Sequence, residues 1–162
     1  MADSKRLRIL KALTALIEEV TVANGFQHDL PGAVFRGRRL FTSNDPLPMV
    51  SILEYLRPDL VETGAGYSRN KNQEDFDLLI QGWAEDDPKN PTDPAHNLLA
   101  DVKKKVAEIR DETSSNYRLG GLTVDLRQDG GVVRPPEETS AKASFYFRVT
   151  LTFVEDVGNP YA

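Results

Sequence analysis

Two stretches of the chain repeat apolar residues every three or four positions, the spacing that places them on one face of an α-helix. This pattern predicts one helix over residues 4–24 and a second over residues 94–111. The apolar positions are Ile9, Leu10, Leu13, Leu16, Ile17 and Val20 in the first helix and Ala95, Leu98, Leu99, Val102, Val106 and Ile109 in the second. Asp93 followed by Pro94 is typical of a helix start, with the acid as the capping residue. The solvent side of the second helix is expected to carry Lys103, Lys104, Lys105, Glu108 and Arg110.

Other apolar residues alternate with polar ones or form short runs, as in β-strands. The clearest strand covers residues 143–153, with Ala143, Phe145, Phe147, Val149, Leu151 and Phe153 on one side and Ser144, Tyr146, Arg148, Thr150 and Thr152 on the other. Residues 75–84 and 122–127 alternate in the same way. Shorter runs at residues 33–40 and 48–55 predict two strands that form a hairpin.

The predicted elements follow one another in the order α-β-β-β-α-β-β. This order indicates an α+β fold, an antiparallel or mixed sheet of about five strands with two helices packed on one face. A length of 162 residues suits a single domain, residues 1–162. Asp129-Gly130-Gly131 predicts a turn before the last strand. Residues 57–74 carry little periodic burial, so we expect a flexible loop there.

Composition narrows the classes of function. The chain has no cysteine, which removes disulfides, thiolate nucleophiles and thiolate metal sites. Its formal net charge of −5 argues against a protein that mainly binds nucleic acid, since that task needs a concentrated basic face. No run approaches the roughly 18 apolar residues of a membrane span, and the start lacks a secretory signal pattern. We therefore expect a protein that stays in the cytoplasm where it is made.

Residues 83–96, WAEDDPKNPTDPAH, concentrate acids and prolines between a predicted strand and a predicted helix. In one interpretation they form a stiff connector, because residues before proline are pushed into extended conformations. In the other, Asp75, Asp77 and Asp86 form the centre of a small metal-dependent nuclease or hydrolase. The connector interpretation explains more of the positions, and it is the one we favour.

Other candidate chemistry is weak. Pro58-Asp59 followed by Asp101-Val102-Lys103 matches the residues of a nuclease motif. Residues 101 and 103, however, fall inside the second predicted helix and face different directions. His28 and His96 each lack a neighbouring acid or histidine at ligand spacing. We predict no catalytic, metal-binding or cofactor-binding residue, and no cofactor.

Five segments together resemble a known family. They are the end of the first helix "VTVANGFQHDL", the runs "AVFRGRRLF" and "NDPLPMVSILE", the stretch "DLLIQGWAEDDPKNPTDPAHNLLADVKKKVAEI" and the closing "FRVTLTFVEDVGNPYA". In their order and their residues they resemble the tail terminator proteins of tailed bacteriophages, the lambda-like minor tail proteins that cap the tail tube. The resemblance covers most of the chain and is weakest between residues 57 and 74.

The resemblance implies a structural virion protein and not an enzyme. Such a subunit forms a hexameric ring on the finished tail tube, ends tube polymerisation and offers a joining surface to the head–neck connector. The implied partners are further copies of the chain, the tail tube protein and the connector protein, in the virion tail and in the host cytoplasm during assembly. DNA would pass through the ring without specific binding, which suits an acidic chain. A neck or head-completion protein is the alternative within the same class.

A closed ring needs heterologous contacts, in which one patch meets a different patch on the next copy. We expect the subunit interface to use Tyr146 and Arg148 on the polar side of the last strand. The arm formed by residues 86–93 is the second candidate, and it carries Asp86, Asp87 and Lys89. Arg69 and Lys71, in the expected loop, are the candidates for contact with the tail tube.

Overall fold

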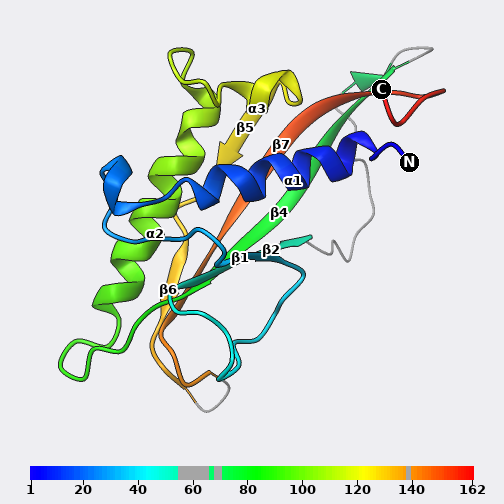
Figure 1. The fold of residues 1–162 in the computed structure, drawn as a ribbon. Helices are drawn as coiled ribbons and strands as arrows, with labels where there is room; N and C mark the ends of the chain where they lie inside the picture. The colour runs from blue at the N-terminus through cyan, green and yellow to red at the C-terminus, as the bar shows by residue number, and fades with distance from the viewer. Residues whose placement is uncertain (55–65, 68–70, 138–139) are drawn as a thin grey trace.

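The computed structural model describes residues 1–54, 66–67, 71–137 and 140–162, in which two long helices cross one face of a seven-stranded mixed sheet (Figure 1). In chain order the elements are α1 (Lys5–Glu18), η1 (Val22–Asn24), β1 (Val34–Arg36), β2 (Met49–Glu54), β3 (Gly66–Tyr67), β4 (Lys71–Trp83), α2 (Asp93–Val106), η2 (Ala107–Arg110), α3 (Arg118–Gly121), β5 (Asp125–Gln128), β6 (Val132–Arg134) and β7 (Ser144–Asp156). The predicted α+β class is confirmed, and the strands beyond the expected five are the short β3 and β6.

The two longest strands form the centre of the sheet. Its order is β1-β2-β4-β7-β5, with β3 beside β4 and β6 beside β7. β4 and β7 have thirteen residues each and pair antiparallel throughout, from Lys71 opposite Asp156 to Trp83 opposite Ser144. Residues 71–74, which we expected in a flexible loop, therefore begin β4, and residues 66–67 form β3. The rest of the predicted loop at 57–74 lies outside the described residues.

The predicted hairpin between the second and third elements is wrong. β1 and β2 run parallel, with Val34 opposite Val50. The segment between them, residues 37–48, carries the chain back to the end of the sheet where β1 began. An Arg38–Asp45 ion pair of 2.5 Å closes this segment, and the Ser51 hydroxyl accepts a hydrogen bond from the Arg38 backbone N–H. A connection of this length permits either a parallel or an antiparallel pair. The apolar pattern of the two strands therefore could not predict their relative direction.

The predicted turn at Asp129-Gly130-Gly131 is also wrong, because the chain does not reverse there. β5 and β6 both pair antiparallel with β7, with Asp125 opposite Thr152 and Val132 opposite Tyr146. They are two parts of one edge strand, interrupted by a bulge. The Asp129 carboxylate stabilises the bulge by accepting hydrogen bonds from the backbone N–H groups of Gly131 and Arg148, both at 3.0 Å.

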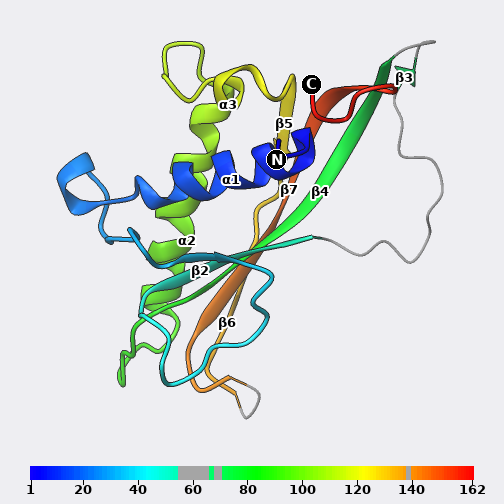
Figure 2. The same ribbon diagram turned by 45° about the vertical axis from the view of Figure 1, so that its right-hand side comes forward.

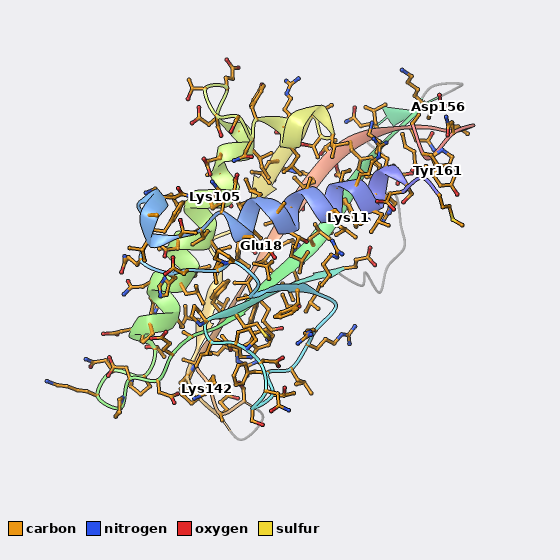
Figure 3. All side chains as sticks on the ribbon, viewed as in Figure 1. Lys11, Glu18, Lys105, Lys142, Asp156 and Tyr161 are labelled. Carbon is orange, nitrogen blue, oxygen red and sulfur yellow. The ribbon has the colours of Figure 1, made fainter. Side chains whose placement is uncertain are left out.

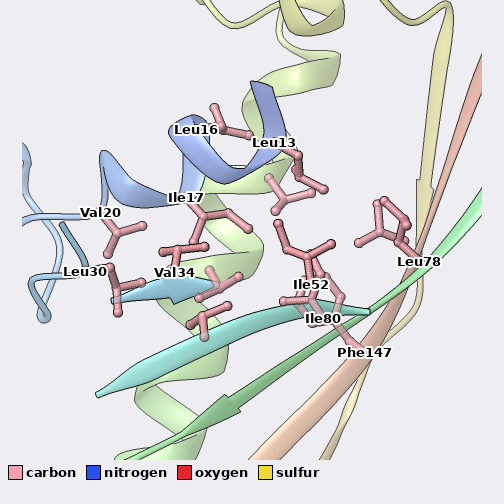
Figure 4. Close-up of a cluster of buried hydrophobic side chains, with 14 of the residues drawn as sticks. Leu13, Leu16, Ile17, Val20, Leu30, Val34, Ile52, Leu78, Ile80 and Phe147 are labelled. Carbon is pink, nitrogen blue, oxygen red and sulfur yellow. The ribbon is translucent and has the colours of Figure 1, made fainter. Parts of the chain in front are cut away.

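The hydrophobic core lies between the two long helices and one face of the sheet. The apolar stripes predicted for the helices are buried except for Leu10, which is half-buried, and the predicted apolar side of β7 is buried throughout. Figure 4 shows Leu13 and Ile17 of α1 above Val34, Ile52 and Ile80 of the sheet. The alternation expected at residues 122–127 fails at its start, because Thr123 is buried and Val124 is 42% exposed, and β5 begins only at Asp125.

The helix boundaries differ from the predicted ones. α1 starts after Ser4, whose hydroxyl accepts the Leu7 N–H at 3.2 Å, but it ends at Glu18 and a separate 3₁₀ turn, η1, follows. α2 begins at Asp93, which makes no capping hydrogen bond, and Thr92 before it makes none either. The predicted cap at Asp93 is therefore wrong, although Pro94 does lie in the first turn, where its missing N–H is not needed.

Lys105 is buried, contrary to the expectation that it faces solvent. Its ammonium lies 2.7 Å from Glu108 and 3.2 Å from Glu19, which directly follows α1. Figure 3 labels Lys105 on α2 and Glu18, the last residue of α1. Burial alone would lower the pKa of Lys105, but the hydrogen bonds and charges of Glu108 and Glu19 outweigh it and raise the pKa above its ordinary value. The side chain therefore stays charged and joins α2 to the end of α1.

The close contact between β4 and β7 at Gly82 gives a stability test. A Cβ atom on Gly82 would lie 2.2 Å from Cε1 of Phe145, whose side chain is fully buried. Gly82→Ala should therefore lower the free energy of unfolding by about 1–3 kcal/mol, measured by urea denaturation. Gly130→Ala is the matched control, since nothing lies within 4 Å of that position, and it should change stability by less than about 0.5 kcal/mol. Equal effects of the two substitutions would contradict this packing.

Candidate assembly surface

The second face of the sheet has no helix on it in the described part of the chain (Figure 2). Because side chains alternate along a strand, the residues of β4 and β7 that do not enter the core point to this side. We call this surface the polar sheet face and define it by Asp75, Asp77, Leu79, Gln81, Arg127, Val132, Tyr146, Arg148, Thr150 and Thr152. It is the side on which the sequence placed Tyr146 and Arg148.

Carboxylates and hydroxyls on the polar sheet face pair across the strands. Asp75 accepts a hydrogen bond of 2.7 Å from the Thr152 hydroxyl and forms an ion pair of 2.8 Å with Arg127. Asp77 accepts a hydrogen bond of 2.7 Å from the Thr150 hydroxyl. Both threonines are buried, so these bonds satisfy groups that would otherwise be left unpaired. The side chains are thus held in place before any partner arrives.

Tyr146 and Arg148 lie beside a pair of shallow depressions on this face. One has a volume of about 300 Å³ and the other about 360 Å³, and Asp129 and Arg148 line both. The second is also lined by Tyr146 and by Val132, which is 46% exposed. The sequence analysis missed the contribution of Val132, since it expected a turn at residues 129–131 and no strand directly after it. Its signal was the apolar pair Val132-Val133 directly after the glycines.

The arm formed by residues 86–93 lies where β4 ends and β7 begins. The Asp86 carboxylate forms an ion pair of 2.5 Å with Lys142. The Asp87 carboxylate accepts hydrogen bonds from the backbone N–H groups of Lys89 and Asn90, both at 3.0 Å. The first half of the arm is therefore held by its own acids, and the Lys89 side chain is exposed.

Lys71, the described candidate for tail-tube contact, lies away from the arm. Lys71 is exposed at the first residue of β4, opposite Asp156, and Arg69 lies outside the described residues. Figure 3 shows Lys142, the partner of the arm, and Asp156 at opposite ends of the molecule. Along the thirteen residues of β4 the two ends are roughly 40 Å apart. The two predicted contact regions are therefore separate surfaces.

The structure does not bring the three acids of the metal-site interpretation together. Asp75 and Asp77 are neighbours on the polar sheet face, where they bind Arg127 and the threonines. Asp86 follows the far end of β4, roughly 20 Å further along the strand from Asp77. Among the residues that the structure describes, no group of three or more histidines and acids has the geometry of a metal site.

One acid–histidine pair was not predicted. Asp101, on α2, is buried, and its carboxylate lies 2.7 Å from Nδ1 of His28 and accepts the Gln27 N–H at 2.9 Å. Asp101 and Lys105 lie three and seven residues after Leu98, on the apolar stripe of α2, and this spacing was the available signal. The pair fixes the segment after α1 against α2. Of the residues that matched the nuclease motif, Asp101 thus makes a structural contact and Lys103 lies on the surface of α2.

The chain was compared with protein-family models, curated proteins and solved structures. No protein-family model and no curated protein matches the sequence. Among solved structures, the chain is similar to a sheath/tube terminator, in its extended state, of an extracellular contractile injection system (PVC), determined by electron cryo-microscopy. The alignment has 16% identity and a TM-score of 0.44, and it covers 93% of this chain and 56% of that chain. The chain thus spans about half the length of that protein, and we draw no functional conclusion from a likeness of this size.

Among the described residues, no helix is both long enough and apolar enough to span a bilayer.

The hydrogen bonds of Asp75 give the next test. Asp75→Asn keeps an acceptor for Thr152 but removes the charge facing Arg127, so unfolding should become easier by about 0.2–1 kcal/mol. Asp75→Ala also leaves the buried Thr152 hydroxyl without a partner and should cost about 1–3 kcal/mol. Chemical denaturation of both variants measures the difference. Equal losses would show that the Thr152 hydrogen bond does not contribute.

Proposed function

We propose that the chain is a tail terminator of a phage-like particle. Six copies close into a ring on the end of a tail tube, stop its polymerisation and present the surface on which the head–neck connector is joined. The ring is part of the virion tail and assembles in the host cytoplasm. DNA passes through its lumen without specific binding. The proposal starts from the resemblance of five sequence segments, distributed from residue 20 to residue 162, to this family.

The observation that carries the proposal is the polar sheet face. Its hydrogen bonds and its Asp75–Arg127 ion pair order the side chains in the single subunit, so association loses little side-chain entropy there. Tyr146, Arg148 and the exposed Val132 add the aromatic, arginine and aliphatic groups common in protein contacts. A broad, pre-ordered, mostly polar surface suits a wet contact between subunits.

The two ends of the molecule carry different contact candidates. Lys71 lies at one end of β4, and the arm of residues 86–93 follows the other end. In a ring whose strands run along the tail axis, the Lys71 end would meet the tube. We assign Lys71, together with Arg69, to the tube side, and Asp86, Asp87 and Lys89 to contacts between subunits.

Tube growth in the presence of the chain tests the proposal. The tube protein of the same particle is polymerised alone and with the chain, and tube lengths are measured by electron microscopy. We expect shorter tubes that carry a sixfold ring at one end. An unchanged length distribution with no ring would contradict the proposal, and a ring that binds the connector but never the tube would indicate a neck protein.

A variant of the polar sheet face makes this test specific. Tyr146→Ala combined with Arg148→Glu should raise the concentration needed for capping by at least about tenfold, because hot-spot residues carry most contact energy. Arg39→Glu, an exposed charge reversal between β1 and β2, is the matched control and should cap like the unaltered chain. Equal loss in both variants would show that the polar sheet face is not the interface.

A further inference from the structure

A depression of about 200 Å³ lies at the C-terminal end of α2, between η2, α3 and β5. Its lining includes Arg110, Tyr117, Arg118, Thr123 and Asp125. The Arg118 guanidinium lies over the Tyr117 ring at 5.0 Å. Within the described residues neither Arg110 nor Arg118 forms an ion pair, and Asp125 forms none. Two arginines thus line this depression without an acidic partner among the described residues.

Thr123 adds an unsatisfied group to the same depression. The residue is 1% exposed, and its hydroxyl makes no hydrogen bond with any described group. Buried hydroxyls are normally paired, so an unpaired one in the lining of a depression marks a place where a polar group is missing. An oxyanion bound beside the two arginines is the kind of acceptor that this hydroxyl lacks.

The backbone that positions Arg118 is unusual. Arg118, Leu119, Gly120 and Gly121 have consecutive positive φ values of 54°, 49°, 69° and 93°. Residues with a Cβ are disfavoured in this left-handed region, and such conformations concentrate at binding sites. Leu119 anchors the turn by burying its side chain, and the Arg118 carbonyl accepts the Thr123 N–H at 3.1 Å. The turn therefore sets Arg118 and Thr123 at one place.

We propose that this depression binds the Glu85 carboxylate of a second copy of the chain. Glu85 directly precedes the arm of residues 86–93, whose Asp86 and Asp87 are held by Lys142 and by a backbone turn. Glu85 is exposed and has no partner among the described residues, so its carboxylate is the one available for a contact. It fits the size of the depression and the sign of the two guanidiniums.

Acidic residues also lie around the depression. Asp125 belongs to its lining, but its position opposite Thr152 directs its side chain to the polar sheet face. Two further acids lie nearby. Asp111 accepts hydrogen bonds from the backbone and hydroxyl of Thr113, which lower its pKa, and Glu112 is exposed outside the lining. The lining itself has a net positive charge, which favours an acidic occupant.

The arm and the depression lie at opposite ends of α2 (Figures 1 and 2). α2 and η2 together run from Asp93 to Arg110, a length of roughly 27–29 Å. One copy cannot close this distance on itself, so the contact must join different copies head to tail, as a ring requires. The inference rests on the proposed function only in taking the occupant to be another copy of the chain.

Two charge-reversal variants test the contact. Arg118→Glu alone and Glu85→Arg alone should each weaken self-association by about tenfold or more, because like charges then meet. Mixed in equal amounts, they should associate again, since each arm then meets a depression of opposite charge. Molecular mass as a function of concentration, by sedimentation and at low salt, measures the association. Recovery in the mixture also shows that both variants are folded.

Arg39→Glu is the matched control and should associate like the unaltered chain. The inference is overturned if the mixture associates no better than the single variants, if Arg39→Glu weakens association equally, or if the unaltered chain stays monomeric throughout. The tube assay separates this failure from that of the proposed function. If the single charge-reversal variants associate and cap tubes normally, only the inference about this contact is contradicted. If the mixture of the two variants associates again but does not cap tubes, only the tail-terminator proposal is contradicted.

Discussion

The antiparallel pairing of β4 with β7 is the constraint on which the rest of the structure depends. Thirteen residues of each strand are paired, so a single register decides which side chains enter the core and which reach the other face. A shift by one residue would exchange the two sets completely. Core packing and the polar ladder of Asp75, Asp77, Thr150 and Thr152 are therefore consequences of the same pairing.

Much of the fold follows from periodicity in the sequence. The stripes of both helices and the alternation in β7 locate the core, because burial imposes these periods directly. Strand direction and chain reversal do not leave such a signal. The segment between β1 and β2 looked like a hairpin connection but joins parallel strands, and Asp129-Gly130-Gly131 has turn residues but forms a bulge. Both depend on long-range pairing with a third strand.

The candidate surfaces also differ in whether the sequence could predict them. Tyr146 and Arg148 could be placed on the polar sheet face because alternation fixes the side to which they point. The depression at Arg110, Arg118 and Thr123 could not be foreseen, because periodicity carries no signal for the left-handed turn at residues 118–121 that shapes it. The buried Asp101 and Lys105 were hidden because a polar residue on an apolar stripe finds partners only in three dimensions.

The central claim is that a rigid β4–β7 frame presents surfaces for assembly. Amide hydrogen exchange tests it most directly, by comparing the free chain with the chain on a capped tube. The account predicts that the β4–β7 amides exchange slowest in both states. It also predicts that new protection on assembly appears in the edge strand of residues 125–134, in residues 85–93 and in residues 117–123. New protection confined to the solvent sides of α1 and α2 would contradict it.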